Sequence, residues 1–160
     1  MARSTFLLGV CCILVAACGS SPTEPKGRVT ISGTALTPDI PQTYNGTFNF
    51  TVTNVGSTTI EFDANMCPGT LEVLNATGTL VYDARFWPTT CAAYSAPTSL
   101  APGEVYHWQE AFPGKLVVSS GGQLTTAPLG NYKARAGAWF WKRFGSVTST
   151  PVDFQVVPLP

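Results

Sequence analysis

Few residues of this sequence are suited to covalent or acid–base catalysis. His107 is the only histidine among 160 residues, and a hydrolytic triad needs a base that titrates near neutral pH, most often a histidine. His107 lies between Tyr106 and Trp108, and the alternation of apolar and polar residues around it predicts an outward position on a strand. The sequence contains no nucleophile elbow, phosphate-binding glycine loop or dinucleotide motif. We therefore expect a protein that is not an enzyme and that uses no cofactor.

An acidic pair offers a second route to chemistry. Glu61 and Asp63 alternate along one predicted strand, which places their carboxylates on the same face about 7 Å apart. Such a pair suits glycoside hydrolysis or calcium binding. Solvated acidic residues on an outer strand face are far more common, however, and no Asp-rich loop supplies further calcium ligands. We expect no metal site here.

The N-terminal segment has the organisation of an export signal. Arg3 precedes an apolar run over residues 6–17, which is followed by Gly, Ser and Pro. The run is roughly a dozen residues long, whereas a transmembrane helix needs about 20. We therefore expect residues 1–17 to be a removable signal peptide. The polar, Pro- and Gly-rich residues 18–27 are typical of a flexible tether.

The four residues that end this signal, Val15-Ala16-Ala17-Cys18, resemble the lipobox of bacterial lipoproteins. The resemblance implies that the Cys18 thiol carries a diacylglycerol and that the lipid anchors the protein to the cell membrane or the outer membrane. The alternative is an ordinary secretory signal with a chance cysteine. The absence of aspartate at Gly19 and Ser20 mildly favours the outer membrane.

Two further cysteines belong to the predicted domain, residues 28–160. Cys67 and Cys91 would remain together in an oxidising compartment, which favours a disulfide between them. A metal-binding or nucleophilic pair is the alternative, but the sequence has no CxxC spacing.

The charged fraction is only 11% and the net charge is zero, so no basic footprint for nucleic acid is present.

The strongest candidates for binding are aromatic residues near cations. If Phe140 faces the core, Trp139 and Trp141 face outward beside Lys133 and Arg135. Contiguous exposed apolar surface commonly marks a binding site, for a protein or for a glycan. The alternative is that a neighbouring loop or the sandwich itself buries both tryptophans.

A second candidate is the segment 86–94, which begins with Phe86 and Trp87. A protease inhibitor needs an exposed loop held rigidly, and Pro88 and Cys91 would supply that rigidity. Small exported domains use the same devices for stability alone, and this is the alternative. We expect residues 86–102 as a whole to form a long loop.

Strands must position all of these residues. Period-two alternation predicts about eight strands and no helix. The predicted strands cover residues 29–33, 47–53, 58–63, 71–74, 80–83, 104–112, 132–141 and 152–157. The strands 47–53 and 58–63 are expected to form one hairpin, and 71–74 and 80–83 a second with Gly78 in its turn. The pattern favours an all-β, immunoglobulin-like antiparallel β-sandwich over a closed barrel, and Tyr132 is a candidate for a tyrosine corner.

Three motifs resemble the domain of the BsuPI-type proteinase inhibitors. They are Asn54-Val55-Gly56 after a strand, a hairpin from Val73 to Gly78, and Leu100-Ala101-Pro102-Gly103-Glu104 before a late strand. The likeness spans about residues 44–136, and the family's Trp-x-Trp-Ser segment is replaced here by residues 82–87. The resemblance implies an immunoglobulin-like fold and supports that fold more than an activity.

Two functions follow as expectations. The first is a non-catalytic lipoprotein of the cell envelope, held at the membrane by the lipid on Cys18, whose β-sandwich binds a protein or glycan. The alternative is a proteinase inhibitor of the BsuPI type that acts through residues 86–94.

Overall fold

The computed structural model describes residues 29–64, 69–88, 97–137 and 147–160. Within these ranges the protein is built from strands and one short 3₁₀ helix, η1 (Ala84–Phe86). The strands are β1 (Val29–Ala35), β2 (Asp39–Pro41), β3 (Gly46–Asn54), β4 (Ile60–Asp63), β5 (Leu71–Asn75), β6 (Leu80–Asp83), β7 (Pro97–Leu100), β8 (Val105–Phe112), β9 (Lys115–Leu116), β10 (Thr125–Thr126), β11 (Gly130–Ala136), β12 (Val147–Ser149) and β13 (Val152–Val157).

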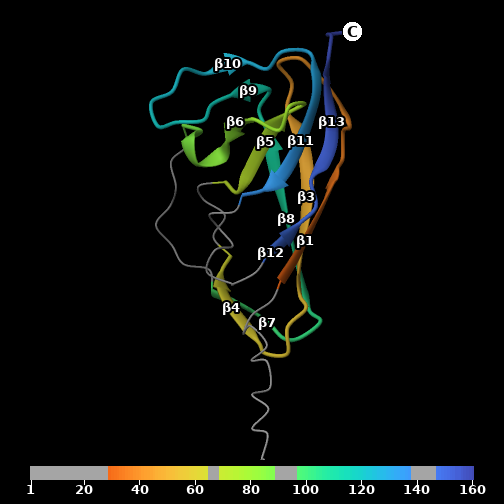
Figure 1. Ribbon diagram of the computed structural model, residues 1–160, viewed down its shortest axis with the longest axis vertical. Coiled ribbons are helices and arrows are strands. Elements are labelled where there is room, and N and C mark those ends of the chain that lie inside the picture. Colours follow the sequence, from red (N-terminus) through yellow and green to blue (C-terminus); the bar gives the residue numbers. More distant parts are fainter. Residues whose placement is uncertain (1–28, 65–68, 89–96, 138–146) are drawn as a thin grey trace, which may run out of the picture.

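Two sheets form the body of the fold (Figure 1). The four-stranded sheet has the order β12-β1-β3-β8, and the five-stranded sheet has the order β2-β13-β11-β5-β6. One sheet therefore contains β1, β3 and β8, whereas the other contains β5, β11 and β13. This is the strand order of immunoglobulin-like domains. The protein is an all-β, immunoglobulin-like antiparallel sandwich, as the alternation predicted.

The sheets carry short additions. The strand β2 pairs in parallel with β13, and β12 pairs in parallel with β1. The two-stranded pairs β4–β7 and β9–β10 lie at opposite ends of the molecule (Figure 1). No helix among the described residues is long and apolar enough to cross a membrane.

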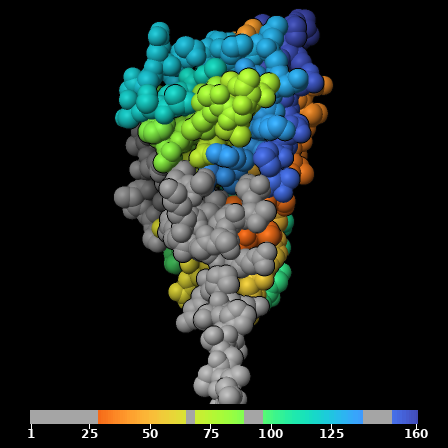
Figure 2. Space-filling view, in the orientation of Figure 1, coloured from red at the N-terminus to blue at the C-terminus, as the bar shows by residue number. Residues whose placement is uncertain are grey.

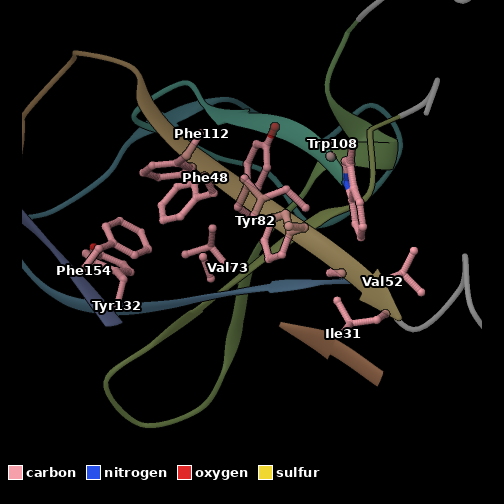
Figure 3. Close-up of a cluster of buried hydrophobic side chains, with 14 of the residues drawn as sticks. Ile31, Phe48, Val52, Val73, Tyr82, Trp108, Phe112, Tyr132 and Phe154 are labelled. Atoms are coloured by element: carbon pink, nitrogen blue, oxygen red, sulfur yellow. The ribbon is translucent and has the colours of Figure 1, made fainter. Parts of the chain in front are cut away.

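The core lies between the two sheets because alternate residues of each strand face inward. In β3 the alternation is complete, and Phe48, Phe50 and Val52 are buried. Phe48 meets Phe154 of the opposite sheet with the ring centroids 5.1 Å apart, and Phe112 meets the same ring at 5.6 Å. Figure 3 shows these three rings clustered together. They join the sheets at the centre of the sandwich.

Each of the eight predicted strands coincides with a strand of the described residues, and the hairpin of β5 and β6 is confirmed; residues 138–141 of the predicted strand 132–141 lie outside the described residues. Gly78 has a φ of +82°, the left-handed conformation that glycine adopts without strain. The side chain of Asn75 closes the turn, because its Oδ1 accepts hydrogen bonds from the backbone N–H groups of Thr77 and Thr79. Sequence reasoning missed five shorter strands, which are β2, β7, β9, β10 and β12.

The hairpin expected between residues 47–53 and 58–63 is wrong. The strand β3 pairs with β1 and β8, while β4 pairs with β7. Asn54 causes the separation, since its buried amide Nδ2 donates to the carbonyls of Thr58 and Leu100 at 2.8 and 2.9 Å. Its Oδ1 accepts from the Gly56 N–H at 2.9 Å, which turns the chain out of the four-stranded sheet.

The long loop expected over residues 86–102 is also partly wrong. Residues 97–100 form β7, and Phe86 ends η1. Periodicity failed here because β7 is short and begins with Pro97, which the sequence rules assign to turns. The tyrosine corner is confirmed, since the hydroxyl of Tyr132 donates to the carbonyl of Pro128 at 2.8 Å.

Candidate functional site

Several residues predicted to be functional lie outside the described part of the chain. They are Cys18, Cys67, Cys91, Trp139 and Trp141. The lipid anchor, the disulfide and the tryptophan patch therefore stay predictions. The structure does describe Lys133 and Arg135, and also Phe86 and Trp87 at the start of the second candidate segment.

Lys133 and Arg135 lie on the outer face of β11, opposite the buried Tyr132, Ala134 and Ala136. Each cation is paired with a carboxylate on a neighbouring strand. The Lys133 Nζ lies 2.7 Å from Asp153 of β13, and the Arg135 Nη2 lies 2.8 Å from Glu72 of β5. The pairs differ in burial, because the Glu72 side chain is 7% exposed and the Asp153 side chain 79% exposed.

The second pair continues into a row of charges across three strands. Glu72 lies opposite Asp83 in the register of β5 and β6. Asp83 is 1% exposed, and its carboxylate accepts hydrogen bonds from the Arg85 Nε at 3.0 Å and from the Arg85 backbone N–H at 3.0 Å. We call the residues Arg85, Asp83, Glu72 and Arg135 the charged ladder. Two buried carboxylates thus lie beneath two guanidinium groups that are each more than a third exposed.

The charged ladder continues into the aromatic pair Phe86 and Trp87. The guanidinium carbon of Arg85 lies 5.3 Å from the centroid of the Phe86 ring, a cation–π distance. The Trp87 ring lies 6.3 Å from the ring of Tyr82, and both Phe86 and Trp87 are partly buried against the core.

The structure thus brings together two candidate regions that are about 50 residues apart in sequence. On the outer face of the five-stranded sheet, the charged ladder runs from Lys133 and Arg135 on β11 to Arg85, whose guanidinium group lies over the Phe86 ring, whereas Trp87 packs against the core residue Tyr82. In Figure 2 the yellow-green atoms of the β5–β6 hairpin adjoin the blue atoms of β11 and β13. Sequence reasoning did not predict this connection, because cross-strand register is not visible in a single sequence.

His107 and the acidic pair lie elsewhere. His107 is exposed on the outer face of β8, as predicted, and its Nδ1 lies 2.8 Å from the Thr51 hydroxyl. Glu61 and Asp63 border a hollow of about 470 Å³ between β4 and β7. Among the described residues, no three His, Cys, Asp or Glu side chains are grouped closely enough to hold a metal ion.

A polar cluster that the sequence did not predict lies between β8 and the start of β5. Glu110 accepts hydrogen bonds from the N–H and the hydroxyl of Thr70, each at 2.7 Å. The Trp108 indole N–H donates to the same Thr70 hydroxyl at 3.0 Å. Burial raises the pKa of Glu110, and these hydrogen bonds only partly oppose the rise. The alternation that placed Trp108 and Phe112 inward was the available signal, since Glu110 lies between them in the same phase.

Two of the motifs that carried the family resemblance meet in space and have a structural role. Asn54 binds the carbonyl of Leu100, and its own backbone carbonyl accepts from the Gly103 N–H at 2.8 Å. The Glu104 carboxylate accepts from the Ala101 N–H at 2.7 Å and closes the turn. These residues therefore fix one corner of the sandwich, and the motifs report the fold rather than an activity.

Comparisons with known proteins found similar solved structures but no match in sequence. No protein family is detected in the sequence, and no curated protein matches it. The structure is similar to part of a β-glucosidase from Erythrobacter marinus, with a TM-score of 0.47, 14% identity, and coverage of 81% of this chain and 15% of that enzyme. It is similar to the CARDB domain of a Pyrococcus furiosus protein, with a TM-score of 0.42 and 13% identity over 84% of this chain and 90% of that domain.

A third similar structure is a PapD-like domain of human CEP192, with a TM-score of 0.36 and 11% identity over 100% of this chain and 99% of that domain. The chain spans only 15% and 16% of the lengths of the two β-glucosidases that head the comparison.

Proposed function

We propose that this protein is a non-catalytic lipoprotein of the cell envelope whose β-sandwich binds a protein or glycan partner. The anchor part of the proposal rests on Val15-Ala16-Ala17-Cys18 after a short apolar run. The binding part rests on the charged ladder, which joins the Lys133 and Arg135 region to Arg85 and to the Phe86 ring beside it.

The arrangement of charge supports a role in recognition. Arg85 and Arg135 are oriented by carboxylates buried beneath them, so their guanidinium groups are held in place before a partner arrives. A fixed guanidinium presents several donors in one plane and stacks on aromatic rings. Arginine and aromatic residues are also the types enriched at binding hot spots. This face therefore has the composition of a recognition surface.

The anchor is tested by intact mass spectrometry of the full chain, expressed in a bacterial host and extracted from membranes. We expect a mass that corresponds to residues 18–160 plus acyl chains, and a shift of about 2 Da on reduction of the Cys67–Cys91 disulfide. Cys18→Ser is the matched control and should abolish lipidation. An unlipidated mass for the wild type would contradict the anchor.

The binding face is tested by substitution. The double variant Trp139→Ala/Trp141→Ala should weaken capture of an envelope partner from solubilised membranes at least about tenfold, without changing the urea midpoint. Arg85→Lys, which keeps a cation beside the buried Asp83 but loses the planar guanidinium, should weaken capture as well. Lys115→Ala is a control, because Lys115 lies on β9 and bonds Thr126 outside the charged ladder. Unchanged capture by both test variants would contradict this part of the proposal.

A second candidate function, proteinase inhibition through residues 86–94, has one specific observation in its favour. Asp83 caps η1 through the Arg85 N–H, and the Trp87 N–H donates to the Ala84 carbonyl at 3.2 Å. The start of the segment is therefore fixed. The full chain at micromolar concentration should slow a panel of serine proteases if this function is present. Rapid cleavage within the segment without inhibition would exclude it.

A further inference from the structure

The outer face of the four-stranded sheet has a composition unlike that of the other sheet. Eleven outward positions of β1, β3 and β8 carry no Asp, Glu, Lys or Arg. They are Thr30, Ser32, Thr34, Thr47, Asn49, Thr51, Thr53, Val105, His107, Gln109 and Ala111. The opposite sheet presents ion pairs on its outer face. Solvated faces of strands usually carry charges, so an uncharged polar face of this extent needs an explanation.

This face is hollowed at its centre. A depression of about 440 Å³ is lined by Thr34, Asn49, Thr51, His107, Trp108 and Gln109. The sheet register explains why these side chains converge. Asn49 lies opposite both Thr34 of β1 and Gln109 of β8, and Thr51 lies opposite His107. A depression of this volume falls in the range of small-ligand sites.

The side chains that line the depression include both hydrogen-bond donors and hydrogen-bond acceptors. Each amide of Asn49 and Gln109 supplies two donors and one acceptor. Neither amide has a hydrogen-bond partner in the part of the chain that the structure describes. His107 is already oriented by its contact with Thr51. The depression therefore presents preformed donors and acceptors without a charge.

The chemistry selects among ligands. Among the described outward residues of β1, β3 and β8, an anion would meet no Lys or Arg, and a cation would meet no carboxylate. A protein partner is expected to meet Arg, Met or exposed aromatic anchors, and none of the eleven positions carries one except the imidazole of His107. Paired amides and hydroxyls instead match the alternating hydroxyl donors and acceptors of a neutral sugar.

We propose that the outer face of β1, β3 and β8 binds a neutral oligosaccharide, with the amides of Asn49 and Gln109 as its principal hydrogen-bonding groups. Thr34, Thr51 and His107 complete the site. The proposal rests on the proposed function only in that both assign a binding role. It uses the sheet opposite to the charged ladder and names the class of ligand.

The test titrates the full chain with cellotetraose and with chitotetraose, and follows binding by calorimetry and by chemical shifts up to about 10 mM sugar. We expect one of these neutral probes to bind and tetragalacturonate, which is anionic, not to bind. The double variant Asn49→Ala/Gln109→Ala should weaken binding at least about tenfold. Gln109→Glu, which adds a charge at nearly the same volume, should weaken it as well.

The fold supplies a matched control. Asn131 and Gln155 form the same cross-strand amide pair on the other sheet, where Asp39 and Asp153 border the adjoining hollow. Asn131→Ala/Gln155→Ala should leave sugar binding unchanged. Equal urea midpoints for the two double variants would show that both are folded.

The remaining outcomes separate this inference from the proposed function. If neither neutral probe binds, or if the control variant loses binding as fully as Asn49→Ala/Gln109→Ala does, the sugar site on this face is overturned. If Trp139→Ala/Trp141→Ala abolishes sugar binding while Asn49→Ala/Gln109→Ala retains it, the proposed function stands and this inference fails. Capture of a protein through Asn49 and Gln109 without sugar binding would also overturn it.

Discussion

At the scale of single residues, Asn54 is a buried polar side chain that connects the end of β3 to the following turn and to Leu100 at the end of β7. It is fully buried, and its amide bonds Thr58, Leu100 and Gly56. Removing the amide leaves the buried Leu100 carbonyl and the partly buried Thr58 carbonyl without this donor, and the buried group costs free energy that no new contact returns.

We therefore expect Asn54→Ala to lower the free energy of unfolding by about 2–4 kcal/mol. Urea denaturation followed by tryptophan fluorescence provides the measurement. Asn131→Ala, at an exposed position, is the control and should change stability by less than about 0.5 kcal/mol. Equal losses in the two variants would contradict a special role for Asn54.

Glu110 gives a second prediction, on pH dependence. Its pKa is raised above the ordinary value of 4.5, chiefly by burial. The folded state then binds this proton more tightly than the unfolded chain does. The associated stability is present below pH 4.5 and is lost as the pH rises through the raised pKa.

Glu110→Gln lacks this proton equilibrium. Across the window that begins at pH 4.5, the free energy of unfolding of the wild type should therefore fall relative to that of the variant, and the difference should become constant at higher pH. Urea midpoints measured at closely spaced pH values test this. A difference that does not change with pH would show that Glu110 titrates alike in both states.

Residue roles were only partly predictable from the sequence. The outward position of His107 and the inward position of Trp108 follow from period-two alternation, which the structure confirms. The partners of Lys133 and Arg135 were not predictable, because they lie on other strands. Glu110 shows the limit of reading hydrophobicity alone, since a carboxylate in an inward phase interrupts an otherwise aromatic face.

At the scale of elements, we expect the two ion pairs formed by β11 to contribute differently to the free energy of unfolding. Arg135 compensates Glu72, whose side chain is 7% exposed, whereas Lys133 faces Asp153, which is 79% exposed. Removing one partner of a buried pair leaves an uncompensated charge, but an exposed carboxylate is resolvated by water.

Arg135→Ala should therefore lower the free energy of unfolding by about 1.5–3 kcal/mol. Lys133→Ala, on the same strand face, should lower it by about 0.5 kcal/mol or less. Thermal and urea denaturation of both variants give the comparison. Similar small losses in both would mean that water reaches Glu72 once Arg135 is removed.

The elements themselves were predictable where alternation is long. The strand β3 alternates over nine residues, and its position follows from sequence alone. Pairing was harder to predict, because adjacency in sequence suggested a hairpin of β3 with β4 that the hydrogen bonds of Asn54 prevent. Short strands such as β9 and β10, with two residues each, carry too few positions for a period to be recognised.

At the scale of the whole molecule, the coupling free energy of one contact between the two sheets can be measured directly. Phe48 and Phe154 come from opposite sheets and their rings meet edge to face. Phe48→Leu and Phe154→Leu should each lower the free energy of unfolding by about 1–2 kcal/mol. The double variant should depart from additivity by at least about 0.5 kcal/mol, because the rings share one contact.

A double-mutant cycle in urea gives this coupling. Phe154→Leu combined with Val105→Ala should be additive within error and serves as the control, because Val105 is 48% exposed and lies at the opposite end of β8 from Phe112, which contacts Phe154. Additivity in the Phe48 cycle would show that the two sheets are stabilised independently at this point.

The sandwich class was predictable because every long strand has one apolar face and many turns separate the strands. The joining of two candidate regions across the five-stranded sheet was not predictable, since it depends on which strands become neighbours. The face of β1, β3 and β8 shows the same dependence. Its uncharged residues come from three separate stretches of sequence that only the register brings together.

The parallel pairing of β2 with β13 has a mechanical consequence. Three register pairs join an early strand to a late one, and both strands run in the same direction. If the protein is tethered through its N-terminal segment and pulled through its C-terminal segment, the two strands are drawn along their length in opposite directions. Their hydrogen bonds then bear the tension together rather than opening one after another. A domain wired in this way should resist stretching between its two ends longer than one whose strands peel apart.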